Sequence, residues 1–338
     1  MSPETTILAA LAIPLAGALL IGLAGRVNDN LRETVTLLTA TVLIACVWSL
    51  LPEIYDGGRP SVRLAEVLPG IEIAFKVEPL GMLFAAMASG LWLVNSIYSI
   101  GYMRGNREKK QTRFYVMFAV SLAAAMGIAF SGNLFTLFLF YEMLTLSTYP
   151  LVSHKGDPAT VRSARVYLGI LISASIGLLL PAVIWTYAVA GTGDFTAGGI
   201  LRGHIEGPQI GLLLGLFVFG AAKAAVMPVH RWLPAAMVAP TPVSALLHAV
   251  AVVKAGVFTI VKIIVYVFGV EFLFAEPSSG WLFYAAAFTI VAASVVALRQ
   301  QNLKRLLAYS TIAQLSYVVM AAAILKPLAE VGAAMHML

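Results

Sequence analysis

Residues 220–262 read GAAKAAVMPVHRWLPAAMVAPTPVSALLHAVAVVKAGVFTIVK, an apolar stretch that contains scattered bases and four prolines. A charged lysine at the centre of a membrane helix costs about 2.5 to 3.5 kcal/mol, so it is retained only where something compensates it. A proline lacks the backbone N–H and clashes with the preceding helical turn. Interrupted backbone is tolerated at membrane depth where it is buried in protein or lines a wet cavity. The stretch therefore predicts a broken membrane helix beside a buried ionic pathway.

The composition of the whole chain is that of a membrane protein. Of its 338 residues, 60% are hydrophobic and 11% are charged, whereas about a quarter of the residues in a soluble domain are charged. We therefore expect an all-α polytopic membrane protein, in contact with the lipid bilayer. The net charge of +6 implies no nucleic-acid partner, because the placement of the basic residues along the loops accounts for it. The one cysteine, Cys46, excludes an intrachain disulfide and a cysteine metal site.

The apolar runs give the number of membrane spans. Runs that approach the roughly 20 residues needed to cross a bilayer occur at about 6–25, 35–51, 80–100, 114–131, 134–153, 163–190, 209–227, 241–268, 281–298 and 306–325, and another begins at Leu328. This predicts ten to eleven transmembrane helices. Between the second and third runs, VRLAEVLPGIEIAFKVEP shows rough alternation about Pro69-Gly70, which predicts a small external β-hairpin. The other connections are short, so we expect no nucleotide or redox-cofactor domain.

The loop charges predict the orientation. The first, third, fifth, seventh and ninth connections hold 14 of the 22 lysines and arginines, the other connections hold 5, and 3 lie inside apolar runs. Cytoplasmic loops of membrane proteins carry the excess of basic residues. We therefore expect a protein of the cell membrane or cell inner membrane, with its N-terminus on the outer, periplasmic side.

Charged residues inside the apolar runs are the candidates for a proton path. Glu142 lies mid-way along its run, with Thr145 and Thr148 one and two turns onward. A carboxylate there must take up a proton or face a cation. Lys223 precedes the Pro228 break and Lys254 lies centrally in the next run, where burial suits a lysine to proton exchange. The alternative is a static Glu142–Lys223 bridge, with Lys254 satisfied by backbone carbonyls.

Three further bases are weaker candidates. His248 lies six residues before Lys254, so the two project to different faces, and water could join them in a relay. His230 could relay protons or cap the broken backbone. Lys262 lies nearer the end of its run, where it could serve the path or extend to the membrane interface. The sequence contains no phosphate-binding loop, dinucleotide fingerprint or zinc-protease motif, so we expect no catalytic residues, bound cofactor or metal in this chain.

Three stretches resemble one known family. FYEMLTLSTYPLV with Glu142, the 220–262 stretch with Lys223, His248 and Lys254, and NLKRLLAYSTIAQLSYV are similar to the antiporter-like subunits shared by Mrp-type Na⁺/H⁺ antiporters, complex I and membrane-bound hydrogenases. The resemblance covers about 75–338. It implies an inverted-repeat fold of two five-helix units with a broken seventh helix, and a hydrated axis formed by Glu142, Lys223, His248 and Lys254.

The resemblance also implies a division of the chain. Residues 1–113 would hold three N-terminal helices and the hairpin, 114–268 the first five-helix repeat, and 281–338 the beginning of the second. Family members usually continue for several more helices, so the second repeat would be incomplete within this sequence.

The function that we expect is that of a proton-translocating subunit of a multisubunit Na⁺/H⁺ antiporter, similar to its D-type component, with other membrane subunits as partners. The main alternative is a proton-pumping subunit of complex I or a membrane-bound hydrogenase, in which catalysis occurs in other chains. An independent solute carrier and a purely structural scaffold are further alternatives. Protons and Na⁺ are the expected ions.

Overall fold

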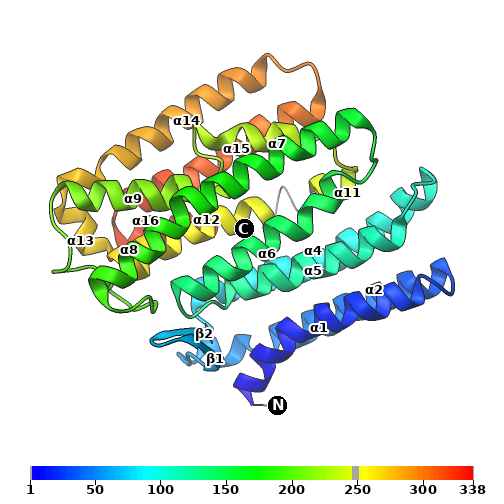
Figure 1. The fold of residues 1–338 in the computed structure, drawn as a ribbon, viewed down its shortest axis with the longest axis horizontal. Helices are drawn as coiled ribbons and strands as arrows, with labels where there is room; N and C mark the ends of the chain where they lie inside the picture. Colours follow the sequence, from blue (N-terminus) through cyan, green and yellow to red (C-terminus); the bar gives the residue numbers. More distant parts are fainter. Residues whose placement is uncertain (1, 246–250, 338) are drawn as a thin grey trace.

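The fold is a bundle of long, roughly parallel and antiparallel helices, with the chain connections gathered at its two ends (Figure 1). The computed structural model describes residues 2–245 and 251–337. Eight helical stretches in this part of the chain are long and apolar enough to cross a membrane: Pro3–Ala24, Asp29–Tyr55, Pro79–Gly105, Gln111–Ala129, Leu134–Val152, Pro158–Ala190, Pro277–Leu298 and Leu303–Ala323. Each coincides with an apolar run of the sequence. The chain is therefore a multi-pass membrane protein.

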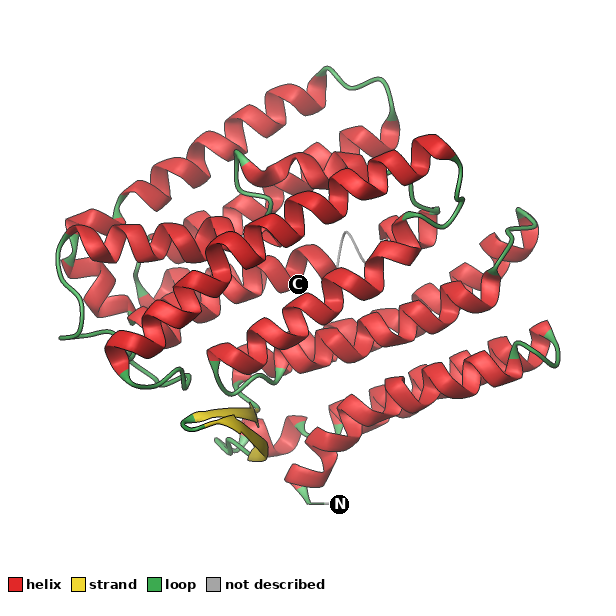
Figure 2. Ribbon diagram, viewed as in Figure 1, coloured by secondary structure: helices red, strands yellow, loops and turns green. Residues whose placement is uncertain are grey.

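The N-terminal part combines helices with one small sheet. Helices α1 (Pro3–Ala24) and α2 (Asp29–Trp48) pack against each other, and the short α3 (Leu51–Tyr55) leads to the hairpin. Strands β1 (Ser61–Leu68) and β2 (Ile71–Lys76) pair antiparallel about the predicted Pro69-Gly70 turn. The hairpin is yellow in Figure 2 and lies at the same end of the bundle as the N-terminus. Helix α4 (Pro79–Gly105) then starts the main bundle.

Polar caps fix where several helices begin. Side-chain oxygens of Asn28, Asn133, Asp157 and Asn302 accept hydrogen bonds from the backbone three residues onward. They precede α2, α6 (Leu134–Val152), α7 (Pro158–Ala174) and α15 (Leu303–Ala323). Such caps satisfy backbone N–H groups that a helix start would leave bare, which is costly near lipid. The length of the apolar run sets the length of each span, and the capping residues determine where these four helices begin.

Helices α5 to α9 lead along the chain to the break. Helix α5 (Gln111–Ala129) packs along α6, and α7 continues through the π-helical η1 (Ser175–Leu179) into α8 (Leu180–Ala190). Helix α9 (Pro208–Gly220) then returns beside η1.

The predicted broken helix is present. Helix α9 ends at Gly220 and is followed by two single turns, η2 (Ala222–Ala224) and η3 (Val229–Arg231), before the short helices α10 (Trp232–Ala236) and α11 (Thr241–Val243). Ala225 adopts the left-handed conformation with φ 57°, which a helix cannot include. The sequence predicts that Lys223 precedes the break, but the residue lies in η2, inside the break itself.

The last part of the described chain packs against this break. Helix α12 (Val252–Ile263) continues into η5 (Ile264–Phe268), and α13 (Val270–Ala275), η6 (Pro277–Ser279), α14 (Trp281–Leu298), α15 and α16 (Pro327–His336) complete the chain. Gly256 of α12 lies directly on the Lys223–Ala224 peptide, so a side chain at position 256 would collide with backbone there. The glycine allows α12 to approach η2 closely.

Candidate functional site

The centre of the candidate site is Lys223, whose side chain has no exposed surface. Its ammonium Nζ donates to the Tyr141 carbonyl oxygen at 2.9 Å and to the Thr145 hydroxyl at 2.6 Å. The same nitrogen lies 3.2 Å from the centroid of the Tyr141 ring. Two acceptors and one aromatic face thus account for the three N–H directions of a protonated lysine.

Tyr141 also stabilises the interrupted backbone. Its hydroxyl accepts a hydrogen bond at 3.1 Å from the backbone N–H of Lys223, which the break removes from a regular helix. Trp232 makes a comparable contact from α10, because its indole N–H donates to the Ala222 carbonyl at 2.7 Å. Sequence reasoning missed Tyr141, since a buried tyrosine beside a carboxylate looks like ordinary packing.

Glu142 lies on the same helix but does not touch Lys223. Within the described residues no ion pair joins the two side chains, so the static Glu142–Lys223 bridge is absent from this structure. Glu142 is half-buried, and its Oε1 is shielded from solvent without a hydrogen-bond partner in the described part of the chain. The carboxylate lines an apolar groove between α5 and α6 together with Met117, Leu139 and Leu146. Among the described residues, the carboxylate therefore has no fixed cation partner.

Two of the other candidates lie on elements that pack against η2. Lys254 is the third residue of α12, the helix that packs against η2, and its side chain is half-buried. His230 belongs to η3, and its ring lies 6.2 Å from that of Tyr309 on α15. His248 lies outside the described residues. The structure therefore brings the elements that carry Lys223, Lys254 and His230 together around one break.

Lys262 does not extend to the membrane interface, which was one of the two interpretations of its sequence position. Its side chain is 1% exposed, and Nζ donates to the Ser131 carbonyl at 2.6 Å. It also lies 3.7 Å from Oε2 of Glu78, which forms a second ion pair with Lys76 at 3.1 Å. Sequence reasoning missed Glu78, because it follows the hairpin in a segment without helical periodicity. Lys262 is thus a buried, paired lysine at the hairpin end of the bundle.

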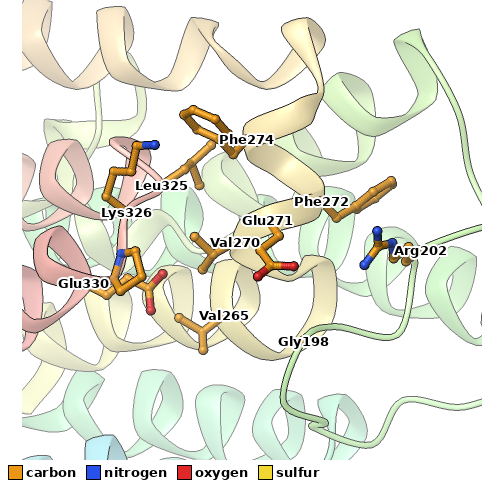
Figure 3. Close-up of a pocket in the computed structure, with 11 residues that line it drawn as sticks. Gly198, Arg202, Val265, Val270, Glu271, Phe272, Phe274, Leu325, Lys326 and Glu330 are labelled. Carbon is orange, nitrogen blue, oxygen red and sulfur yellow. The ribbon is translucent and has the colours of Figure 1, made fainter.

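One cavity with two acidic side chains is separate from Lys223. It has a volume of about 460 Å³ and is lined by α13, the 198–202 segment and the start of α16. Figure 3 shows Glu271 and Glu330 turned toward the middle of this cavity, and Lys326 turned toward Phe274. The Lys326 Nζ lies 3.8 Å from the Phe274 ring centroid. None of the proposed path residues lines this cavity. Over 2–245 and 251–337, no three His, Cys, Asp or Glu side chains gather in a metal-binding arrangement.

Comparison with known proteins gives the family. The family model described as "NADH:quinone oxidoreductase/Mrp antiporter, TM" matches residues 131–338, and that described as "NADH-Ubiquinone oxidoreductase (complex I), chain 5 N-terminus" matches 69–115. The chain belongs to the NADH:quinone oxidoreductase/Mrp antiporter family. The first match contains Glu142, Lys223 and Lys254, and the second contains strand β2 and helix α4.

Individual members of this family extend the comparison. The chain is 30% identical to a Rhizobium meliloti protein named as a probable K(+)/H(+) antiporter component of type A/B, over 96% of this chain and 32% of that protein. It is also 30% identical to an NAD(P)H-quinone oxidoreductase subunit 5 of Paulinella chromatophora, over 91% of this chain and 48% of that protein. The A1 component of a Staphylococcus aureus Na(+)/H(+) antiporter is 29% identical, over 92% and 38%. The chain thus spans about a third to a half of these relatives, whose names denote A-type components and chain 5 rather than the D-type component.

Solved structures confirm the antiporter-like fold of the family. A chain of the Mrp complex from Dietzia superimposes with a TM-score of 0.80 and 26% identity, over 98% of this chain and 36% of that one. A chain of the archaeal membrane-bound sulfane sulfur reductase superimposes with a TM-score of 0.78 at 22% identity, over 94% of this chain and 64% of that one. The second likeness concerns the fold alone.

Proposed function

We propose that this chain is a proton-carrying subunit of a multisubunit monovalent cation/proton antiporter. The observation that carries the proposal is Lys223, a wholly buried lysine in a helix break, bound by neutral acceptors from the helix that also carries Glu142. A lysine without a fixed counter-ion can lose and regain its proton at lower cost than one locked in an ion pair. The names of the antiporter relatives agree with this role.

The proposed proton path comprises Glu142, Lys223, Lys254 and His248, with His230 as a secondary candidate. Lys262, the other candidate from the sequence, is held by Glu78 and Ser131, and we leave it out of the path. Lys223 and Glu142 would exchange protons over the short distance between η2 and α6, and Lys254 would pass them on along α12. Na⁺ or K⁺ would move elsewhere in the complex, in exchange for the protons. Other membrane subunits are therefore the required partners, as the names of the Mrp and antiporter relatives suggest.

Antiport in membrane vesicles tests this proposal. The intact complex and the Glu142→Ala variant would be expressed in an antiporter-deficient host, and everted vesicles would be given NaCl or KCl while a pH-sensitive dye reports proton release. We expect the variant to lose most of the signal, because Lys223 then lacks its exchange partner. Equal signals from equal amounts of assembled complex would defeat the assigned role of Glu142.

A second candidate function has its own support. The match of residues 69–115 to the chain 5 N-terminus and the NAD(P)H-quinone oxidoreductase relatives favour a proton-pumping subunit of a respiratory complex. Affinity purification distinguishes the two. Flavin and iron–sulfur subunits that co-purify with the chain would favour the respiratory complex, whereas a set of small membrane subunits without flavin would favour the antiporter.

We also propose the orientation that the loop charges predict. The protein would lie in the cell or inner membrane, with its N-terminus on the outer, periplasmic side. The connection at 106–110 holds Arg107, Lys109 and Lys110, and it lies at the same end of the bundle as Lys155, since Arg113 at the start of α5 donates to the His154 carbonyl. Labelling of single cysteines introduced near residues 58 and 109 with an impermeant reagent would test it, and labelling of position 109 alone from outside would reverse the orientation.

A further inference from the structure

We propose that Tyr141 and Thr145 form a cage that holds Lys223 in its protonated form, away from Glu142. Both would be positioning residues for proton carriage by Lys223. The inference rests on the proposed function and adds the groups that decide where the lysine carries its charge.

The cage matches an ammonium group donor by donor. Lys223 Nζ donates to the Tyr141 carbonyl and to the Thr145 hydroxyl, and the Tyr141 ring face lies against the remaining N–H direction. The Thr145 hydroxyl itself donates back to the Tyr141 carbonyl at 3.1 Å. The hydroxyl proton is therefore already used, and a lone pair of the hydroxyl oxygen accepts the hydrogen bond from the lysine.

The same cage suits a neutral amine less well. A neutral lysine keeps two N–H donors for the carbonyl and the hydroxyl, but it loses the third donor and the positive charge that attracts the ring face and strengthens both hydrogen bonds. The side chain has no exposed surface, so bulk water does not reach the amine to donate to its lone pair. Loss of the proton thus removes the attraction to the ring and weakens both hydrogen bonds, so the cage favours the protonated lysine.

Glu142 provides the competing position. It follows Tyr141 directly in the sequence, and its Oε1 lies shielded and without a hydrogen-bond partner among the described residues. A protonated Lys223 that leaves the cage gains this carboxylate and loses two neutral acceptors and a ring face. The lysine then has two alternative sites on one helix, and the strength of the cage sets how readily it moves between them.

Other titratable groups lie around this arrangement. Glu142 shares α6 with the cage, and Tyr167 of α7, His230 of η3 and Lys254 of α12 belong to elements packed against η2. Thr148 offers a matched control, since it lies on α6 and is as buried as Thr145, but its hydroxyl is bound to Tyr167 at 2.5 Å rather than to Lys223.

The experiment compares pH profiles of antiport in vesicles that contain the whole complex, for wild type and for Thr145→Val, Thr145→Ser and Thr148→Val. A hydrogen bond to a charged group contributes enough that its loss should move the alkaline limb of the profile to lower pH by about one unit. We expect that shift for Thr145→Val, and a profile like that of wild type for Thr145→Ser and Thr148→Val. Thr145→Ala replaces Thr145→Val if the valine variant does not assemble, and Lys223→Met is measured alongside.

Three results would overturn the cage: a wild-type profile for Thr145→Val and Thr145→Ala, the same shift in Thr148→Val, or activity lowered equally at every pH. If Lys223→Met itself retains full antiport, the proposed function fails, and not the cage alone.

Discussion

Lys223 and Lys262 are both buried lysines, but different groups surround them. Lys262 lies at the hairpin end of the bundle, where Glu78 supplies a carboxylate at 3.7 Å and Ser131 a carbonyl. Lys223 lies in the helix break, where a carbonyl, a hydroxyl and a ring face are its partners and no carboxylate of the described chain lies within ion-pair distance. Burial alone therefore does not identify a proton carrier. A lysine with a fixed counter-ion holds its charge for structure, whereas one bound by neutral groups can exchange it.

Replacement of the two lysines by methionine gives the largest expected contrast. Lys223→Met should abolish antiport while the complex still assembles, because methionine fills the apolar space but carries no proton. Lys262→Met should retain antiport, because Glu78 keeps Lys76 as a partner. Vesicle antiport normalised to assembled complex measures both. Loss of antiport in Lys262→Met at full assembly would place Lys262 in the proton path and remove the contrast.

Removal of the Glu78 carboxylate tests whether the ion pair with Lys262 stabilises the fold. Glu78→Ala leaves both Lys262 and Lys76 without their carboxylate, and breaking a buried pair in this way costs roughly 3 to 5 kcal/mol. We expect a clearly lower apparent melting temperature of the detergent-solubilised complex. Glu72→Ala is the matched control, because the Glu72 pair with Arg63 in the hairpin involves a largely exposed arginine and should matter little. If the melting temperatures of Glu78→Ala and wild type are equal, Lys262 needs no counter-ion for stability.

These contacts also show how far the sequence leads. The spans follow from apolar length, and the hairpin follows from a Pro-Gly turn between alternating segments. The break follows from prolines near Lys223. The partners of the buried lysines could not be predicted, because Tyr141 lies 82 positions from Lys223, and Ser131 lies 131 positions from Lys262. Such pairs depend on how helices pack rather than on local pattern.

Thr145 illustrates the same limit at short range. Its spacing from Glu142 suggested a shared helical face, yet its hydroxyl serves Lys223. Lys262 was open to two interpretations from sequence, since a lysine near a helix end can extend to the interface or turn inward. Only the position of Glu78 decides between them, and nothing in its local sequence marks it as buried.

His154, outside the membrane spans, gives a smaller test of how burial changes the protonation of a base whose ring nitrogens have no hydrogen-bond partner among the described residues. It lies in the loop after α6, is 3% exposed, and has the Glu108 carboxylate at 3.8 Å. Burial lowers the pKa of His154 to about 4, and the charge of Arg113 acts in the same direction. Because the pKa is lowered from an ordinary value near 6.5, the unfolded chain takes up a proton at a higher pH than the folded chain.

The stability that neutral His154 contributes should therefore be complete above about pH 6.5 and should be lost as the pH falls toward 4, by up to about 3 kcal/mol. In His154→Gln this loss disappears, so its melting temperature should fall less than that of wild type between pH 7 and 5. His204→Gln, which alters an exposed histidine of the 191–207 connection, is the control and should follow wild type. If His154→Gln and wild type lose stability in parallel, protonated His154 is stabilised by Glu108 at 3.8 Å. A carboxylate at 3.8 Å would then suffice to hold a buried base in its charged form, which would strengthen the assignment of Glu78, at 3.7 Å, as the fixed counter-ion of Lys262.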